Sequence, residues 1–586
     1  MKNLLNLSMF FMATMIVGCS TSSKYETSRS PQQETTVSSL QYEFVRAVCE
    51  DKPCLKVTLS FEGDGSGKTI IKLPSKGAGQ KELERAILSL NPISTETKLQ
   101  KISSSTYEIH FAPKSLVSIQ YSMVQDFTGE IADHENYYRA VIQKDYFHLF
   151  GQVLFAHPEM NDLQPIHISL KWTGFQNQKI ANSFGANQFK QEINTNLRKL
   201  LGGVYLGGDF RLKKMMVRGK PVWTSLRGSF GFKDAEFQSM MKKILEAERG
   251  FWNDDDFPYF LISAIPVSDE GDDYGGCGLT QGFSIFGSTQ MKINDRMIHL
   301  LSHELFHTWN GRKIQREDPE ELVYWFSEGF TNYYARLLSL RAGLMTLPIF
   351  LKDYNQVLKN YWMSPARNEP VSRVLKDFWN NRDVEKLPYQ QGDILAQRWN
   401  AKIKEASNGA KSLDHFMKDF LTAAQTQGDV VSPSTVDRLM RPYLVEGVFQ
   451  DHENFISKGK TIELYPQKIG NCIQLGMLQV YPFDLGFDFN ASKLVKKVIG
   501  VKSGGLAERA GLKDNQVLTG WSVNSGDVEH EASFTILTEN GKQKISFVPR
   551  GAVIEVPQYQ LDEAKFKKDP KSCLDYFALD LGFNFL

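Results

Sequence analysis

The chain has 586 residues, of which 41% are hydrophobic and 23% are charged. This length is ample for three or four domains. The 68 basic and 67 acidic residues give a formal net charge of +1 and are interspersed without a long basic run, which argues against a nucleic-acid partner.

The first residues have the pattern of a targeting segment. Lys2 supplies a positive charge, and the apolar stretch from Leu4 to Val17 is too short to span a bilayer. The adjoining IVGCS sequence resembles a bacterial lipobox, which implies cleavage before Cys19 and lipidation of that cysteine. The alternative is a plain secretory signal with a chance cysteine. We therefore expect a lipoprotein signal peptide over residues 1–18.

Residues 19–40 are polar and rich in serine and threonine, which predicts a flexible tether between the lipid anchor and the folded protein. The lipobox implies a bacterial cell envelope, with the protein lipid-anchored and facing the periplasm. Ser20 stands where some Gram-negative lipoproteins carry an acidic retention signal, which favours the outer membrane.

Residues 41–172 contain several segments in which apolar residues alternate, which predicts an N-terminal antiparallel β domain. Residues 173–462 come next as a second domain, with a mixed sheet first and helices after it.

The cysteines that follow the targeting segment fit an oxidising compartment. Cys49 and Cys54 flank a turn-like tetrapeptide, and Cys472 and Cys573 could bracket the last domain, but their connectivity stays open at this stage.

The apolar run IHLLSHELFHTW predicts a helix that carries an HExxH motif. Because helical residues four apart share a face, His303 and His307 could bind one zinc ion. Glu304 lies beside them and is placed to take a proton from an attacking water. The alternative is a helix with two surface or core-edge histidines.

A catalytic zinc site needs a third protein ligand and one open position. Twenty residues separate His307 from Glu328, which lies in the helical segment LVYWFSEGFTNYYARLLSL among apolar and aromatic residues. Burying this carboxylate costs free energy unless it is paired or bound to a metal. Glu328 is therefore the predicted third ligand, against the alternative of a lone surface glutamate.

The segments SHELFHTWN and WFSEGFTNYY resemble the glycyl aminopeptidase family of zinc metallopeptidases, whose motifs run close to HExFHxWN and WFxEGxTxYY. The matching residues beyond the zinc motif are Trp309, Asn310, Gly329, Thr331, Tyr333 and Tyr334. The resemblance implies a thermolysin-like α/β catalytic domain that binds one zinc per chain through His303, His307 and Glu328, with Glu304 as the base.

Two further roles are implied by the same resemblance. The segment PYQQGDILAQRW is similar to the family's YxxG segment, which puts Tyr389 where a hydroxyl stabilises the oxyanion. Without that pattern Tyr389 would read as an ordinary interfacial tyrosine. Asn332 stands where some relatives carry an aspartate that orients a zinc-binding histidine.

The glycine-rich segment YGGCGLTQGFSIFG departs from the family pattern. Relatives carry a GGLEH-like segment here, and Gly275 and Gly276 are accordingly predicted to bind substrate. The acid that would hold a free amino terminus is missing, although Glu270, Asp272 and Asp273 lie just before. Because a cationic amine prefers a carboxylate partner, strict aminopeptidase specificity stays open.

Residues 463–586 resemble a PDZ domain through DLGFDF, KKVIGVKSGGLAERAGLKDNQVLTGWSV and ISFVPRG. Leu485, Gly486 and Phe487 match the loop with which PDZ domains bind a peptide carboxylate. This resemblance implies a C-terminal peptide ligand. The alternative is a generic β domain. The end of the chain, DLGFNFL, is expected to form a strand on this sheet.

The sequence thus predicts a multidomain α+β protein with an N-terminal β domain, an α/β catalytic domain with a helical C-terminal part, and a PDZ-like β domain. The expected function is a membrane-anchored zinc metallopeptidase, an aminopeptidase that prefers N-terminal glycine or alanine. One alternative is an endopeptidase or short-peptide peptidase on the same zinc site. Another is a non-catalytic, PDZ-containing peptide-binding protein with a vestigial zinc fold.

Overall fold

A computed structural model describes residues 38–77, 79–131, 136–175, 178–267 and 274–577. The predicted signal peptide, the lipidation site Cys19, most of the tether and the DLGFNFL end lie outside the described residues. The chain divides into two compact units. Of the described residues, one unit contains those up to Asn310 together with Tyr334–Met345, and the other contains Gly311–Tyr333 and those from Thr346 onward.

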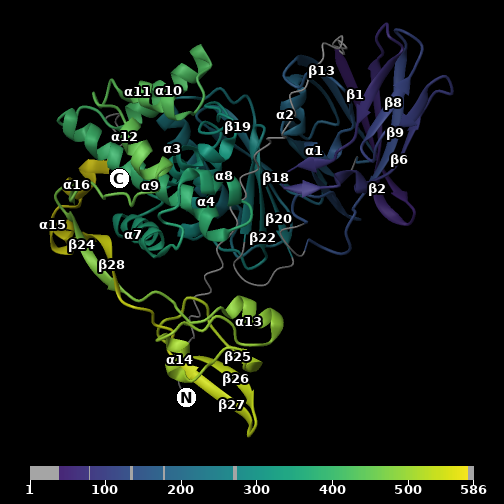
Figure 1. The fold of residues 1–586 in the computed structure, drawn as a ribbon. Helices are drawn as coiled ribbons and strands as arrows, with labels where there is room; N and C mark the ends of the chain where they lie inside the picture. The colour runs from purple at the N-terminus through teal and green to yellow at the C-terminus, as the bar shows by residue number, and fades with distance from the viewer. Residues whose placement is uncertain (1–37, 78, 132–135, 176–177, 268–273, 578–586) are drawn as a thin grey trace. The chain divides into compact units, whose positions relative to one another are not determined.

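The N-terminal β domain is built around a six-stranded sheet, drawn in purple to blue in Figure 1. Side chains along its strands alternate between buried and accessible, so apolar residues collect on one face and form the core. The strand order is β16 (Lys190–Asn196), β13 (Pro165–Thr173), β1 (Ser39–Cys49), β2 (Lys52–Glu62), β9 (Leu116–Val124) and β6 (Ile87–Pro92).

Two features of this domain differ from the prediction. Strand β1 pairs with β13 in parallel, so the sheet is mixed and not purely antiparallel. The β structure also continues beyond residue 172, because β16 pairs with β13 along its whole length. The Cys49–Cys54 disulfide closes the β1–β2 hairpin as expected.

Among the described residues, this domain also contains two smaller sheets, a two-stranded sheet of β4 (Lys76–Gly77) and β5 (Gln80–Lys81), a 3-10 helix (Leu83–Ala86) and two short α-helices. One sheet has the order β12 (His157–Pro158), β3 (Lys68–Lys72), β8 (Thr106–His110), β7 (Lys98–Lys101). The other has the order β10 (Val141–Ile142), β11 (Tyr146–Phe150), β17 (Val204–Gly208), β14 (Lys179–Asn182), β15 (Gly185–Ala186). The helices are α1 (Gly151–Leu154) and α2 (Leu197–Leu201).

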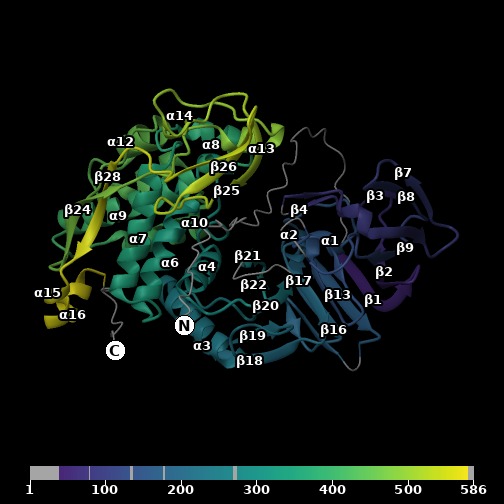
Figure 2. The same ribbon diagram turned by 90° about the horizontal axis from the view of Figure 1, so that it is seen from below.

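A second five-stranded sheet precedes the zinc-motif helix and is mixed, as predicted. Its order is β18 (Arg211–Val217), β19 (Lys220–Leu226), β20 (Phe260–Val267), β22 (Gly282–Ser288), β21 (Tyr274–Leu279), and most of these strands can be followed in Figure 2. The central pairs β19–β20 and β20–β22 are parallel, whereas β21 runs antiparallel at the edge. Helices α3 (Asp234–Trp252) and α4 (Asp295–Phe306) pack against each other.

The helical part comes after the zinc motif, as predicted. It contains α5 (Tyr324–Ser327), α6 (Gly329–Arg341), α7 (Leu347–Met363), α8 (Val371–Asp377), α9 (Arg382–Ala406), α10 (Leu413–Gln427) and α11 (Pro433–Met440). Helix α9 is buried along most of its length and packs on α5. In the described part of the chain, no helix combines the length and the apolar run that crossing a bilayer requires.

The C-terminal residues form two separate sheets. Strands β23 (Lys468–Ile469), β24 (Ile473–Val480) and β28 (Ile554–Leu561) make one sheet, and β28 lies beside α7 in both ribbon views. The Cys472–Cys573 disulfide joins this sheet to α16 (Pro570–Leu574) and encloses the residues between.

Residues between β24 and β28 have a small apolar core of their own. It includes β25 (Val517–Ser522), β26 (Ala532–Thr538), β27 (Gly541–Phe547) and α14 (Leu506–Ala510). The predicted carboxylate-binding loop, Leu485–Phe487, leads into α13 (Phe489–Val495) where peptide addition would require a strand. The PDZ resemblance and its C-terminal peptide ligand stay predictions.

Candidate metal centre and active site

The zinc motif lies at the C-terminal end of α4. The helix begins where the Asn294 side chain accepts a hydrogen bond from the Met297 amide at 2.9 Å, and its apolar residues are buried. His303 is in the last turn, and His307 comes just after the helix but keeps an αR backbone conformation. The i, i+4 geometry is therefore preserved, and the two Nε2 atoms lie 3.0 Å apart.

Aromatic residues that the family motif shares hold this helix end in place. The ring of Phe306 stacks on Tyr334 at 5.1 Å between centroids, and the fully buried Trp309 packs beside Trp252. The Trp309 indole also donates a hydrogen bond to Asp254 at 2.8 Å. Trp309 and Tyr334 thus act as core residues that fix the position of the histidines.

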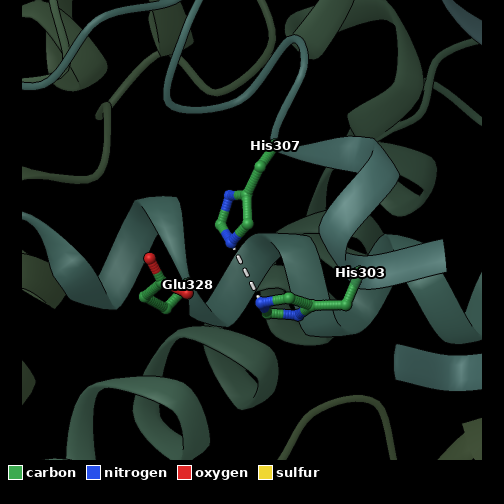
Figure 3. Close-up of side chains that lie close together, drawn as sticks. All are labelled: His303, His307 and Glu328. Carbon is green, nitrogen blue, oxygen red and sulfur yellow. Dashed lines mark hydrogen bonds between the residues drawn. The ribbon is translucent and has the colours of Figure 1, made fainter. Parts of the chain in front are cut away.

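The structure brings the three predicted ligands together. The ligand atoms of His303, His307 and Glu328 all lie within 4.8 Å of one another, and the side chains point toward a common centre in Figure 3. The exposed fractions are 0% for His303, 6% for His307 and 3% for Glu328, so water hardly competes for these atoms.

This set of side chains fits zinc. Zinc in proteins takes histidine nitrogen and carboxylate oxygen, and two nitrogens at about 2.0–2.1 Å on one tetrahedral ion lie roughly 3.3 Å apart. The observed 3.0 Å between the two Nε2 atoms is close to that spacing. Three protein ligands also leave a fourth position open, which is the arrangement of catalytic sites.

The backbone sets the tautomer of His307. Its Nδ1 donates to the Asn310 carbonyl oxygen at 2.9 Å, which leaves the Nε2 lone pair directed at the ligand cluster. Asn310 was identified from the sequence only as a motif match. Its carbonyl role could not be predicted, because any residue type offers that oxygen.

Glu304 is 2% exposed and faces the edge strand β21. A Cβ atom placed on Gly276 would stand 3.5 Å from the Glu304 Cγ, in ordinary contact. The Tyr138 hydroxyl donates to the Gly276 carbonyl at 3.4 Å, and burial and then the charge of Glu304 raise the pKa of Tyr138 well above its usual value. Nothing in the sequence indicated that Tyr138 lies beside Glu304.

The predicted substrate-binding glycines lie on β21. Gly275 and Gly276 pair with Phe286 and Ile285 of β22, and the other edge of β21 carries no paired strand among the described residues. No residue of β21 is acidic. The acids proposed as substitutes, Glu270, Asp272 and Asp273, lie outside the described residues.

Glu328 is surrounded by charged and aromatic residues from the helical part. The Arg316 Nη1 lies 3.8 Å from Glu328 Oε1 and 3.1 Å from Glu320 Oε2. Burial lowers the pKa of Arg316, but the charges of Glu320 and Glu328 outweigh burial and raise it. Tyr389, half-buried on α9, is near enough to add to this effect.

Asn332 is half-buried on α6, and its backbone amide donates to the Glu328 carbonyl at 2.9 Å. This bond belongs to the helical backbone. The expected contact between the Asn332 side chain and a zinc-binding histidine stays a prediction.

Comparison with known proteins supports this interpretation. The family model described as M61 glycyl aminopeptidase matches residues 296–386, a range that contains the HExxH motif, Glu328 and Asn332 but ends before Tyr389. No curated protein matches the chain in sequence.

Solved structures resemble the chain at low sequence identity, and the first of them shares its fold. An aminopeptidase N family protein from Idiomarina loihiensis superposes with a TM-score of 0.69 at 15% identity, over 92% of this chain and 100% of that chain. An M1 zinc metallopeptidase from Deinococcus radiodurans gives a TM-score of 0.47 at 11% identity, over 74% of this chain and 96% of that chain.

The fold is accordingly a multidomain α+β arrangement of the aminopeptidase type, with an N-terminal β domain and a helical C-terminal part. The family match covers the motif residues that the structure gathers into the buried histidine–histidine–glutamate group. On these grounds, the protein is a zinc metallopeptidase.

Proposed function

We propose that the protein is an aminopeptidase that removes small N-terminal residues, glycine or alanine, from peptides, and that one zinc ion is held by His303, His307 and Glu328. The observation that carries this proposal is the buried group of three ligands directly beside Glu304. The matched family is described as a glycyl aminopeptidase, which supports the preference for small residues.

In peptide hydrolysis, the zinc ion, Glu304 and Tyr389 would each have a separate role. A bound zinc ion would supply Lewis acidity, which lowers the pKa of a water molecule and polarises a carbonyl group. Glu304 takes the proton of the attacking water and passes it to the leaving amine. Tyr389 donates its hydroxyl proton in a hydrogen bond to the developing oxyanion, which stabilises negative charge in the transition state.

The edge strand β21 is the proposed platform for the substrate backbone. An extended peptide can add to the open edge of a sheet through backbone hydrogen bonds. Gly275 and Gly276 carry no side chain there, so a peptide backbone can come close to the strand, and Gly276 lies next to Glu304. This arrangement would bring a scissile bond within reach of the base.

A second candidate function is favoured by one specific observation, the missing acid on β21. An enzyme that requires a free amino terminus needs a carboxylate for the ammonium group. Without one, an endopeptidase or short-peptide peptidase on the same zinc site would cut N-terminally blocked peptides as well.

For the cellular context, we propose anchoring in the bacterial envelope through lipidated Cys19, with the enzyme facing the periplasm. The disulfides Cys49–Cys54 and Cys472–Cys573, both within the described residues, support exposure to an oxidising compartment. Metabolic labelling with a fatty acid, compared between the native chain and Cys19→Ser, tests the anchor directly.

The deciding experiment is a hydrolysis assay of zinc-loaded protein on matched peptides with free and acetylated amino termini. Cleavage confined to free peptides that begin with glycine or alanine would support the aminopeptidase. Equal cleavage of both sets would favour the second candidate. Absence of cleavage in a broad peptide library, with zinc bound, would overturn both.

A further inference from the structure

Arg316 is held rigidly by its backbone. It forms an isolated parallel bridge with Val431, and the neighbouring residues add two hydrogen bonds, from the Val431 amide to the Gln315 carbonyl at 2.7 Å and from the Glu317 amide to the Val431 carbonyl at 3.1 Å. The guanidinium packs close to Gly311, where an added Cβ would stand 2.9 Å from Nη2. The backbone around Arg316 is therefore hydrogen-bonded to Val431, and its guanidinium packs against Gly311.

The guanidinium joins two carboxylates of different function. Nη1 lies 3.1 Å from Glu320 Oε2 and 3.8 Å from Oε1 of the metal ligand Glu328. The side chains are nearly out of contact with water, with exposed fractions of 12% for Arg316, 19% for Glu320 and 4% for Glu328. Removal of the cation would leave two buried carboxylates facing each other, which is strongly unfavourable.

The same guanidinium lies among aromatic residues of the site. Its Cζ is 5.8 Å from the centre of the Tyr324 ring, on the helix that ends at Glu328.

We propose that Arg316, balanced by Glu320, is a positioning residue of the metal centre, which orients the Glu328 carboxylate for zinc. The inference rests on the proposed function through the role of Glu328. Partners that orient metal ligands commonly contribute about 10- to 100-fold to metal affinity or activity. Arginine suits the place because its planar fork spans two carboxylates, which a lysine ammonium does not do equally well.

A purely structural ion pair is the alternative, and it predicts a different result. In that case, Arg316→Gln would lower the thermal stability of the zinc-free protein and leave its zinc affinity unchanged. A positioning role predicts weaker zinc binding, partial recovery in Arg316→Lys, and a loss mainly in kcat with little change in KM.

The experiment compares the full-length native chain with Arg316→Gln, Arg316→Lys and Glu320→Gln. The control is Arg373→Gln, which breaks a helical ion pair of 2.8 Å with Asp377 at an arginine whose side chain is 40% exposed. Zinc affinity is measured by competition with a chromophoric chelator. Thermal stability is measured on zinc-free protein. The values of kcat and KM are measured with the peptide that the native chain cuts best in the hydrolysis assay.

We expect Arg316→Gln to weaken zinc binding about 10- to 100-fold, Arg316→Lys to recover part of this loss, and Arg373→Gln to bind zinc as the native chain does. Glu320→Gln should also weaken zinc binding, because the guanidinium charge then acts on Glu328 alone. This variant keeps the inference testable if Arg316→Gln does not fold.

Native zinc affinity in both Arg316→Gln and Glu320→Gln would overturn the positioning role. A native chain that binds zinc but cuts no peptide would overturn the proposed function alone, since zinc affinity is measured without substrate.

Discussion

Gly392 on α9 lies directly against the backbone of Trp325 on α5. A Cβ atom added to Gly392 would stand 1.6 Å from the Trp325 carbonyl oxygen and 2.8 Å from the Gly329 Cα. Glu328 stands between Trp325 and Gly329 in sequence, and Tyr389 precedes Gly392 by one helical turn. The glycine of the YxxG segment therefore permits the close packing that sets the place of Tyr389 relative to Glu328.

Gly392→Ala should disrupt this packing, since no neighbouring side chain can move aside to make room. We expect the free energy of unfolding to fall by about 1–3 kcal/mol or more, as in overpacked cores, and peptide hydrolysis to fall with it. Urea denaturation measures the first effect. Gly65→Ala serves as the control, because an added Cβ there meets nothing within 4 Å, and equal stability of the two variants would contradict the packing argument.

Glu304→Gln should abolish hydrolysis while zinc stays near one per chain. The amide keeps the size of the side chain but cannot accept the proton of the attacking water. The measurements are peptide turnover and metal content by atomic absorption. Glu246→Gln, at a glutamate in an exposed helical ion pair with Lys242, is the matched control. Substantial turnover in Glu304→Gln would refute the base assignment.

Tyr389→Phe should lower kcat by about 100- to 1,000-fold, the usual effect of removing one oxyanion donor. Because the hydroxyl acts on charge that develops in the transition state, we expect KM and zinc affinity to change little. Steady-state kinetics and chelator competition test this. Native kcat in the variant would show that Tyr389 is an ordinary interfacial residue.

His148 makes the N-terminal β domain sensitive to acid. Its Nε2 lies 3.3 Å from the Ser263 hydroxyl and 3.2 Å from the Ser284 hydroxyl, and burial lowers its pKa to about 3. The unfolded chain binds a proton near pH 6.5, so the contribution of neutral His148 to stability is complete above that pH and is lost as the pH falls toward 3.

The expected slope approaches about 1.4 kcal/mol per pH unit within this window for one histidine. His157, whose pKa burial lowers to about 4, adds to the effect. Urea unfolding at a series of pH values measures it, and His148→Gln should reduce the slope. A slope identical to that of the native chain would contradict the assignment.

The disulfides Cys49–Cys54 and Cys472–Cys573 should differ in their contribution to stability. Cys472 and Cys573 are 101 residues apart, whereas Cys49 and Cys54 are five apart. In the chain-entropy account, a loop of about 100 residues gives up to roughly 4.7 kcal/mol, and a very short loop gives less. Paired replacement by alanine should therefore destabilise the C-terminal pair more. Denaturation of the two double variants measures the difference.

The motif residues were predictable because their geometry is local. The spacing of His303 and His307 places both on one helix face in any α-helix, and Glu328 was marked as a lone acid among apolar residues. The mixed sheet before α4 was predictable from equally local patterns, whereas the pairing of the cysteines stayed open until the structure showed it. The family match then agreed with what these short segments indicated.

Other features depend on contacts between distant segments. The parallel pairing of β1 with β13 and the extension of the β structure to β16 both differ from the expectation. Alternation of apolar residues predicts a strand but not its partner.

By itself, the sequence determined which side chains can bind zinc and which carboxylate can act as a base, because helix periodicity and residue chemistry are enough for that. Only the tertiary structure decided what surrounds them. Tyr138 reaches the strand beside Glu304 from far along the chain, and Arg316 meets both Glu320 and Glu328 at one guanidinium. Such neighbours arise from packing, so no local pattern could have predicted them.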